Sequence, residues 1–403
     1  MKKFDIIIVG GGAAGFFAAI NTAQLNPDLS IAILERGNAV LSKVKISGGG
    51  RCNVTHAEFI PNDLVTYYPR GQKELKGPFH SFMTGDTMAW FETHGVPLKI
   101  EDDGRVFPVS NSSQTIIDCF LEQGEKYGIE VKKNCAVRSI KQAQNGWKVE
   151  TTKAFFECNK ILLATGSNPK IWNVLKTLGH AIVPAVPSLF TFNINDFRLE
   201  NIPGVVAKNV HIQVLGTALQ SEGPLLVTHS GLSAPAILKL SAYGAIELAK
   251  LNYKFKIQIK FIRQDTDWCL QFLLDQKQES SKKLVRKTAL FSLPKRLWEQ
   301  LVKASKVDQH LRWADVTKVQ LQDLSNQLTR AVFEVDGKST FKEEFVTAGG
   351  IDLKEINFKT FESKRLKNLF FAGEILNIDG VTGGFNFQNA WTGAYIAAQE
   401  LSK

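Results

Sequence analysis

The sequence contains no continuous apolar run of roughly 18 residues, the length that a membrane-spanning helix needs. The nearest approach, residues 4–20, is interrupted by Asp5 and by several glycines, so it also differs from the hydrophobic core of a secretory signal peptide. We therefore expect neither a membrane span nor a secretory leader.

Cysteine is scarce as well. The five cysteines are an odd number, lie far apart and include no C-x-x-C pair: Cys52, Cys119, Cys135, Cys158 and Cys269. This spacing argues against a disulfide scaffold and against a zinc site, and we expect no metal. Free thiols fit a reducing compartment, so the sequence predicts a cytoplasmic protein.

Acidic residues are outnumbered, because 39 Asp and Glu oppose 49 Lys and Arg and leave a formal net charge of +10. The excess is concentrated between Leu251 and Lys306, where 13 basic side chains face five acidic ones. Such a region can attract RNA, anionic lipid or an anionic substrate, or it can be the solvated face of amphipathic helices. We favour the solvated face and expect a small-molecule substrate rather than nucleic acid, with no membrane partner.

The order of apolar segments predicts one α/β domain interrupted by another. A buried strand over 4–9, a glycine turn, a helix over 13–25 and a second buried strand over 31–34 form a βαβ unit, which builds parallel sheets. Further along, Asn145-Gly146 predicts a type I′ hairpin turn.

The interruption begins where prolines and short β-like runs replace the opening pattern. We expect a β-rich part over about 185–265 and a helical part over about 268–306, both within an inserted domain at 185–345. The first domain then comprises 1–184 and 346–403, and it ends in an amphipathic helix from Asn386 to Leu401.

The first glycine turn carries the spacing G-x-G-x-x-G. Gly10 permits the tight turn, Gly12 lets the backbone approach a pyrophosphate, and Gly15 allows close contact between helix and strand. Glu35 ends the next strand, where a carboxylate can bind ribose hydroxyls and repel a 2′-phosphate. The pattern predicts a site for FAD or NAD rather than NADP.

Two further glycine-rich segments favour FAD. Ser47 to Asn53 contains three adjacent glycines, whose exposed N–H groups suit phosphates or a flavin ring lying against the backbone. Near the C-terminus, Ala372-Gly373-Glu374 follows a strand, and Gly380 to Asn386 opens the last helix. A helix N-terminus there would stabilise negative charge on a reduced flavin, an element for which NAD dehydrogenases have no use.

Together, the segments Gly10–Gly15, Ser47–Asn53, Val346–Ile351, Phe371–Trp391 and Thr228–Ala236 resemble those of a bacterial NAD(P)/FAD-dependent oxidoreductase family. That family includes aminoacetone oxidases and reductases of unsaturated bile-acid intermediates. The resemblance covers essentially the whole chain. It implies an α/β fold: a glutathione-reductase-type, Rossmann-like FAD-binding domain with an inserted β-rich substrate domain and a helical subdomain.

The resemblance also assigns residues to a non-covalently bound FAD. The ADP half would be held by Gly10, Gly12, Gly15 and Glu35, with Val137, Ala164, Thr165 and Gly166 on the adenine side. The pyrophosphate, ribityl chain and isoalloxazine would lie along Lys43, Gly49, Gly50, Arg51, Asn53, Glu374, Gly384, Asn386 and Phe387. Their neighbours are expected at the cofactor too: Ala13, Ala14, Arg36, Ser47, Gly48, Cys52, Gly373 and Gly383.

This chain departs from the family pattern at two places. Leu41-Ser42-Lys43 stands where the family usually has Gly-Arg-Lys, so only the lysine of that segment persists. Phe385-Asn386 stands where Tyr-Asn is more usual, so a phenol available for hydrogen bonding is absent from position 385.

Several reactive features are missing or isolated. No second G-x-G-x-x-G occurs between residues 166 and 370, so we expect no separate nicotinamide-binding domain. Cys52 has no partner at redox spacing, and we expect it to pack beside the flavin rather than to act as a redox centre. His229 is the candidate proton donor, although a loop histidine bonded to backbone explains it equally well.

These features predict an FAD-dependent oxidoreductase that moves a hydride between flavin and a small organic substrate. The leading hypothesis is an NAD(P)H-dependent reductase of an activated double bond, followed by an amine oxidase that passes electrons to oxygen. An RNA-acting flavoprotein is an alternative of a different class, and a non-catalytic FAD-binding scaffold is the third.

Overall fold

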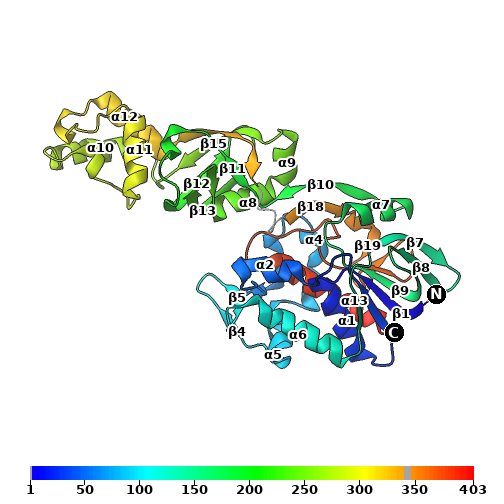
Figure 1. Cartoon of the computed structure of the whole chain (residues 1–403). Coiled ribbons are helices and arrows are strands. Elements are labelled where there is room, and N and C mark those ends of the chain that lie inside the picture. The colour runs from blue at the N-terminus through cyan, green and yellow to red at the C-terminus, as the bar shows by residue number, and fades with distance from the viewer. Residues whose placement is uncertain (1, 340–345) are drawn as a thin grey trace. The chain divides into compact units, whose positions relative to one another are not determined.

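The computed structural model describes residues 2–339 and 346–403, which fold as two compact units (Figure 1). Unit 1 comprises Met1–Val186 and Lys342–Lys403, and unit 2 comprises Pro187–Phe341. The sequence predicts a first domain of residues 1–184 and 346–403, so its first boundary lies two residues before that of unit 1. Its second boundary, between residues 345 and 346, lies at the edge of a segment outside the described residues.

Unit 1 is built on a sheet whose central strands are parallel and run in the order β21-β9-β1-β2-β6. Their bounds are Leu369–Phe371, Phe155–Leu163, Lys2–Val9, Ile31–Leu34 and Glu130–Lys132. All four residues of β2 are buried, as are the last four of β1, because helices cover both faces of a parallel sheet. The first and last thirds of the chain therefore share one sheet.

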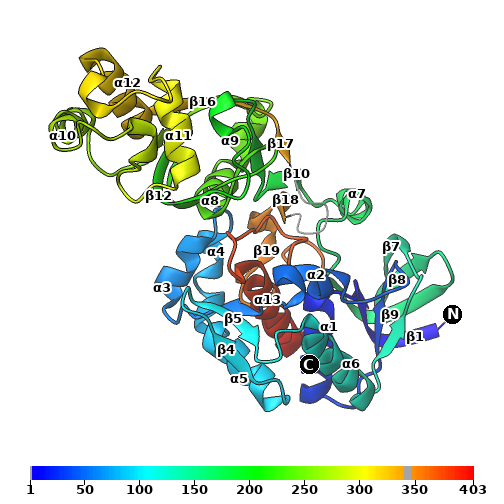
Figure 2. The ribbon, with the colours of Figure 1, turned by 60° about the vertical axis from the view of Figure 1, so that its left-hand side comes forward.

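Two helices from opposite ends of the chain pack together beside this sheet, α1 (Ala13–Leu25) and α13 (Phe385–Leu401) (Figure 2). Apolar residues occupy nearly every side of α1, since it is enclosed by the sheet, by α13 and by α6 (Ser113–Lys126). Trp391 is fully buried between them, and its ring centroid lies 5.1 Å from that of Phe17 and 5.7 Å from that of Phe120.

Smaller elements complete unit 1. A three-stranded antiparallel sheet has the order β3-β5-β4, with bounds Thr55–His56, Arg105–Pro108 and Leu98–Ile100. The short helical segments between and around these strands are α2 (Ser42–Gly50), α3 (Pro61–Leu64), η1 (Val65–Tyr67), α4 (Gln72–Leu75), η2 (Pro78–His80), α5 (Thr84–Thr93) and α7 (Pro169–Thr177). At the sheet margin lie β7 (Val137–Ala143), β8 (Gly146–Thr151), β19 (Ile356–Asn357), η6 (Leu353–Glu355) and β20 (Glu362–Ser363), while β10 (Ile182–Ser188) pairs with β18 (Val346–Ile351).

Unit 2 contains a seven-stranded sheet in the order β16-β15-β12-β13-β14-β11-β17, in which all the pairings are antiparallel. The bounds are Ala331–Asp336, Lys254–Lys260, Val206–Val214, Gln220–Val227, Gly231–Ser233, Thr191–Asn193 and Lys338–Ser339. Helix α8 (Pro235–Tyr243) packs on β13 and is followed by α9 (Ala245–Lys250). An antiparallel sheet of this kind is not a dinucleotide-binding fold, in keeping with the missing second fingerprint.

The helical part of unit 2 is an excursion between β15 and β16. It contains α10 (Thr266–Glu279), η4 (Val285–Lys287), α11 (Lys295–Ala304), η5 (Trp313–Asp315) and α12 (Lys318–Thr329). These helices share one hydrophobic core with the sheet, centred on the fully buried Trp298 and Trp313. The helical segment is therefore longer than the sequence predicts, because it continues past Lys306 through α12.

The predicted βαβ unit and the last helix form at the expected places, but the hairpin turn differs. Ala143 pairs directly with Gly146, so the two turn residues are Gln144 and Asn145 rather than Asn145 and Gly146. Gly146 opens β8 instead, with φ +133°, and a Cβ there would lie 2.1 Å from the Cys158 carbonyl oxygen. The glycine is required by this close approach to β9 and not by the turn type.

No helix within the described residues is both long and apolar enough to cross a membrane. The same residues also contain no group of three or more His, Cys, Asp or Glu side chains that could hold a metal ion.

We expect Trp391→Phe to lower the free energy of unfolding by about 2 kcal/mol, since a buried carbonyl loses its donor and the core loses volume. The Trp391 indole N–H donates to the Val54 carbonyl at 2.9 Å, and this bond ties α13 to the segment before β3. Urea denaturation measures the change. Trp268→Phe is the matched control, because Trp268 is 45% exposed and its replacement should cost less than about 0.5 kcal/mol. Equal costs for the two variants would contradict the prediction.

Candidate functional site

The carboxyl ends of three parallel strands meet in unit 1. Val9 pairs with Leu163, which in turn pairs with Phe371, so the residues following β1, β9 and β21 lie next to one another. Backbone bonds continue past the strands: Ala164 N donates to the Val9 carbonyl at 2.8 Å, and Ala372 N donates to the Leu163 carbonyl at 3.1 Å. This edge is where open α/β sheets bind their ligands.

The three glycines of the first turn meet three different steric demands. Gly10 has φ +113°, and a Cβ there would lie 2.4 Å from the Ala164 carbonyl oxygen. A Cβ on Gly15 would lie 2.0 Å from the Gly10 carbonyl oxygen, so helix and strand touch at this point. A Cβ on Gly12 would meet nothing within 4 Å, which leaves open space in front of the backbone where a pyrophosphate needs it.

Glu35 lies beside this turn at the end of β2. Its Oε2 accepts a hydrogen bond from Gly11 N at 2.9 Å, and its Oε1 accepts one from Gly37 N at 2.6 Å. The carboxylate therefore shapes the glycine turn, and its predicted contact with a ribose stays a prediction. Cys135 N donates to the Glu35 carbonyl at 2.8 Å, which brings the segment leading to Val137 to the same place.

Two helices begin at this site without a side-chain cap. Neither α1, with Gly12 at its N-cap, nor α13, with Gly384, has a capping side chain or an acidic residue in its first turn. Free N–H groups and the positive end of the helix dipole attract anions. The start of α1 therefore suits a pyrophosphate, and the start of α13 suits a group that gains negative charge.

The second glycine segment lies at the end of α2, where the helical conformation breaks. Gly48, Gly49 and Gly50 have φ of +56°, +67° and +83°, a run of left-handed residues that side chains would strain. Cβ atoms on Gly49 and Gly50 would meet nothing within 4 Å. The exposed backbone of these glycines is thus free to lie against a ligand.

Cys52 follows these glycines and is fully buried. Burial raises the pKa of the Cys52 thiol to about 12, so no appreciable thiolate exists at neutral pH. The four other cysteines are also free and buried. A thiol held in this state is a poor nucleophile and a poor redox centre.

Asn53 joins the second glycine segment to the last helix. With its amide oriented to suit its neighbours, the oxygen accepts from Gly384 N at 3.0 Å and the nitrogen donates to the Thr55 carbonyl at 2.9 Å. Gly384 has φ +95°, and a Cβ there would lie 2.6 Å from the Thr55 carbonyl, so no side chain fits between the two segments. Thr55 Oγ1 also donates to Gln388 Oε1 at 2.6 Å.

Three further charged residues that are predicted to bind the cofactor, Lys43, Arg51 and Glu374, have partners in unit 1. Lys43 Nζ lies 2.5 Å from Glu374 Oε2, joining α2 to the segment after β21. Arg51 pairs with Glu101 at 2.6 Å, and its guanidinium stacks on the Phe107 ring at 3.9 Å. The Arg51 hydrogen bond lowers the pKa of the Glu101 carboxyl below its usual value.

Asn386 closes the turn in front of α13. Its side-chain oxygen accepts from Gly380 N at 2.8 Å, and its side-chain nitrogen donates to the Gly380 carbonyl at 2.9 Å. Phe387 lies on the next position and stacks on Trp391, with ring centroids 5.4 Å apart and planes inclined by 7°. Asn386 thus holds the glycine turn in shape, which the sequence pattern does not indicate.

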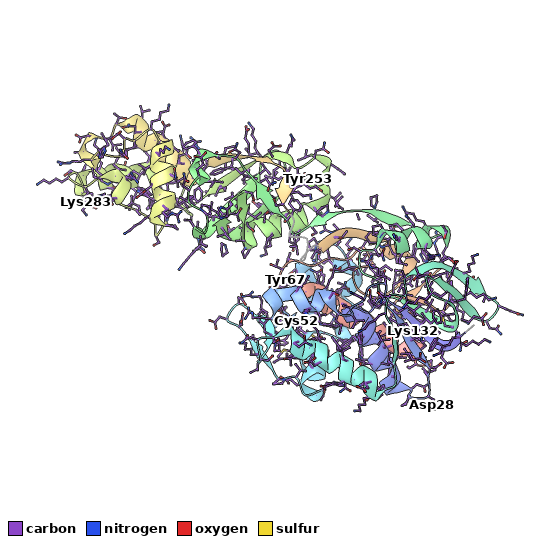
Figure 3. The ribbon with its side chains drawn as sticks, viewed as in Figure 1. Asp28, Cys52, Tyr67, Lys132, Tyr253 and Lys283 are labelled. Atoms are coloured by element: carbon purple, nitrogen blue, oxygen red, sulfur yellow. The ribbon has the colours of Figure 1, made fainter. Side chains whose placement is uncertain are left out.

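Sequence reasoning missed a group of aromatic residues at this turn. Tyr67 stacks on Phe385 with centroids 4.2 Å apart and planes inclined by 11°, and the His56 ring lies 4.7 Å from Phe385. His56 Nδ1 donates to the Gly383 carbonyl at 3.2 Å. Figure 3 labels Tyr67 and Cys52 in the same part of unit 1. The absence of a tyrosine at position 385 is the only sequence signal that points toward this group.

The predicted residues are thus gathered in unit 1, with one exception. They come from the turns after β1, β2, β9 and β21, from the start of α1, from α2 and the residues that follow it, and from the start of α13: Gly10, Gly12, Ala13, Ala14, Gly15, Glu35, Arg36, Lys43, Ser47, Gly48, Gly49, Gly50, Arg51, Cys52, Asn53, Ala164, Thr165, Gly166, Gly373, Glu374, Gly383, Gly384, Asn386 and Phe387. Val137 begins β7. His229 belongs to unit 2, where it is exposed in the turn between β13 and β14.

The chain is similar in sequence to proteins of known function. The chain is similar over essentially its full length to a ribosomal RNA dihydrouridine synthase of Escherichia coli, at 28% identity over 100% of this chain and 98% of the relative. A 3-dehydro-bile acid delta(4,6)-reductase of Clostridium scindens is 23% identical over 98% of this chain.

Solved structures show the same fold at low identity. A 3-ketosteroid-delta4-(5alpha)-dehydrogenase from Rhodococcus jostii aligns with a TM-score of 0.52 and 12% identity, covering 100% of this chain and 97% of the other. The model of the HI0933-like protein Rossmann domain matches residues 4–400. The chain therefore belongs to the HI0933-like family of FAD-dependent oxidoreductases with a Rossmann-type domain.

Proposed function

We propose that unit 1 holds FAD along the edge formed by β1, β9 and β21. Glu35 binds the ribose of the ADP half, the open backbone at Gly12 and the start of α1 bind the pyrophosphate, and the N-terminus of α13 faces the flavin ring. The carrying observation is the pair of uncapped helix N-termini, those of α1 and α13, together with the open space in front of the backbone at Gly12, Gly49 and Gly50. When bound, FAD supplies the hydride chemistry.

We further propose that the reaction is the reduction of a carbon–carbon double bond conjugated with a carbonyl group. The two full-length relatives support it, because both of their named products arise by this chemistry. Dihydrouridine is uridine with its ring double bond reduced, and a delta(4,6)-reductase removes double bonds conjugated with a ketone. The α13 N-terminus stabilises the negative charge that a hydride-donating flavin carries before transfer.

A small conjugated ketone is the first candidate for the substrate, and a uracil within RNA is the second. Identity with the dihydrouridine synthase favours RNA, as does the basic composition of the helical part of unit 2. The exposed aromatic residue there, Trp268, does not add support. It lies on α10 among Asp265, Asp267 and Asp275, whose carboxylates would repel a phosphate backbone.

We expect Gly12→Val to abolish FAD binding while the protein stays folded. The valine has room in the fold but occupies the place of the pyrophosphate, so affinity should fall at least about 100-fold, ~2.8 kcal/mol. Flavin content after purification and Tm of the flavin-free proteins measure the two effects. Gly77→Val is the matched control, because a Cβ on Gly77 also meets nothing within 4 Å and Gly77, the N-cap of η2, belongs to none of the segments predicted to bind the cofactor. Normal FAD content in Gly12→Val would contradict the assignment.

Cys52→Ser should keep most of the turnover, with a change below about tenfold, ~1.4 kcal/mol of barrier. The reason is that the raised pKa and complete burial of the thiol leave no thiolate to act. Labelling with iodoacetamide at neutral pH should also leave Cys52 unmodified in the native protein. A loss of several orders of magnitude, with FAD still bound, would show that the thiol takes part in catalysis.

Anaerobic photometry of the flavin tests the proposed reaction. NADH or NADPH should bleach the flavin, and a 3-oxo-4,6-diene steroid should restore its colour faster than oxygen does. Because unit 2 is not a second dinucleotide-binding fold, donor and acceptor should use one site in turn and give ping-pong kinetics. Faster recovery with an unmodified ribosomal RNA transcript than with the steroid would identify RNA as the substrate. Bleaching by an amine with recovery in air, and no response to either nicotinamide, would identify an oxidase instead.

A further inference from the structure

The segment containing Tyr67 is fastened to the turn that precedes α13. Val381 N donates to the Tyr67 carbonyl at 2.9 Å. Three residues further, Arg70 forms an ion pair with Asp379, whose side chain is fully buried, and the two residues also form an isolated β-bridge. The segment from Tyr67 to Arg70 is therefore held against the glycine turn at both of its ends.

The ring of Tyr67 is fixed as well. It stacks on Phe385, and the Phe385 carbonyl accepts a hydrogen bond from the Tyr68 hydroxyl at 2.7 Å. The His56 ring centroid lies 5.8 Å from that of Tyr67 and 4.7 Å from that of Phe385. Tyr67 itself is half-buried, and its hydroxyl has no hydrogen-bond partner among the residues that the structure describes. A rigid ring thus carries a free phenol at the start of α13.

Other groups near this turn are unsuited to donating a proton. Cys52 is buried, with a pKa of about 12. Burial lowers the pKa of His56, which favours its neutral form. The Nδ1–H of the neutral ring donates a hydrogen bond to the Gly383 carbonyl, so Nε2 carries no proton. The Tyr68 hydroxyl is buried and bonded to Phe385. Of these four side chains, Tyr67 alone carries a hydroxyl without a hydrogen-bond partner among the described residues.

We propose that Tyr67 is the catalytic proton donor of this enzyme and that it supplies the phenol that position 385 lacks. The inference rests on the proposed reduction of a conjugated double bond. Its support is the location of a free, immobilised hydroxyl at the helix N-terminus assigned to the flavin ring.

The reaction balances with one hydride and one proton. The hydride, supplied by the reduced flavin, forms a C–H bond at the carbon β to the carbonyl, and the π bond of the substrate breaks. The Tyr67 O–H bond then breaks as its proton forms a C–H bond at the α carbon. The phenolate recovers a proton from water, to which the half-buried side chain has access. Burial, with Glu58 and Asp63 nearby, raises the pKa of Tyr67, so the phenol is protonated at neutral pH.

Tyr67→Phe tests the role, because it keeps the stacked ring and removes only the hydroxyl. Flavin content, Tm and bleaching by the nicotinamide should stay unchanged. Reoxidation of the flavin should slow by roughly 100-fold or more with whichever acceptor reoxidises the wild-type flavin, the diene steroid or the RNA transcript. The wild-type rate should also fall at pH above the ordinary pKa of tyrosine, and this limb should be missing in the variant. Tyr127→Phe, at the C-cap of α6, is the control and should behave as the wild type.

A second measurement does not depend on turnover. Tetranitromethane should nitrate Tyr67 but not the buried Tyr68, and the saturated ketone product, or the reduced transcript, should slow nitration of Tyr67 several-fold without protecting Tyr127. If the wild type turns over while Tyr67→Phe keeps its rate and pH profile, Tyr67 is not the donor and the proposed reaction still stands. Unprotected nitration of Tyr67 would likewise overturn the proposal. If neither acceptor restores the wild-type flavin, the proposed reaction fails, and the role of Tyr67 fails with it.

Discussion

Parallel pairing of β1 with β9, and of β9 with β21, is the constraint on which the site depends. It sets the ends of three strands in register, although they come from the first, the second and the last part of the chain. Once Val9, Leu163 and Phe371 are aligned, the three following turns must lie side by side, and each brings its own ligand groups. Gly10 has to be glycine because the Ala164 carbonyl occupies the space that a side chain would need. The strand pairing that builds the sheet therefore also leaves open space in front of the backbone at Gly12.

A second set of bonds holds the other half of the site. Asn53 bonds to Gly384, Trp391 to the Val54 carbonyl, and Thr55 to Gln388, so the start of α13 is fixed to the segment after α2. These are long-range contacts, formed only after the ends of the chain have met. A cofactor that lies across both sets would bind only the assembled unit 1, and its binding free energy would add to the stability of the fold.

Local patterns in the sequence were sufficient to predict β1, α1, β2 and α13, because continuous apolar runs and helical periodicity report burial directly. Spacing alone also indicated that Gly10 and Gly15 lie at close backbone contacts, as they do. It predicted cofactor contacts for Gly12 and Glu35, and these stay predictions. The shifted hairpin could not be predicted, since Gly146 is required by the carbonyl of Cys158 on a neighbouring strand and not by its own turn. The clasp made by Asn386 and the pairing of Lys43 with Glu374 likewise depend on contacts between distant segments.

The aromatic group at Tyr67 shows most clearly how a site can be hidden from sequence. Tyr67 lies in a three-residue helical segment that belongs to no motif, and it is separated from Phe385 by more than three-quarters of the chain. Yet the exchange of a phenol between the two positions is physically simple. Two stacked rings 4.2 Å apart can each present a hydroxyl to the same neighbourhood, so loss of a hydroxyl from one ring is offset when the other carries it. Tyr67 is also the more suitable position for an acid, because Phe385 is fully buried while Tyr67 retains the access to water that reprotonation requires. The departure at position 385 therefore changes only which residue holds the proton. The N-terminus of α13 and the positive end of its dipole stay the same.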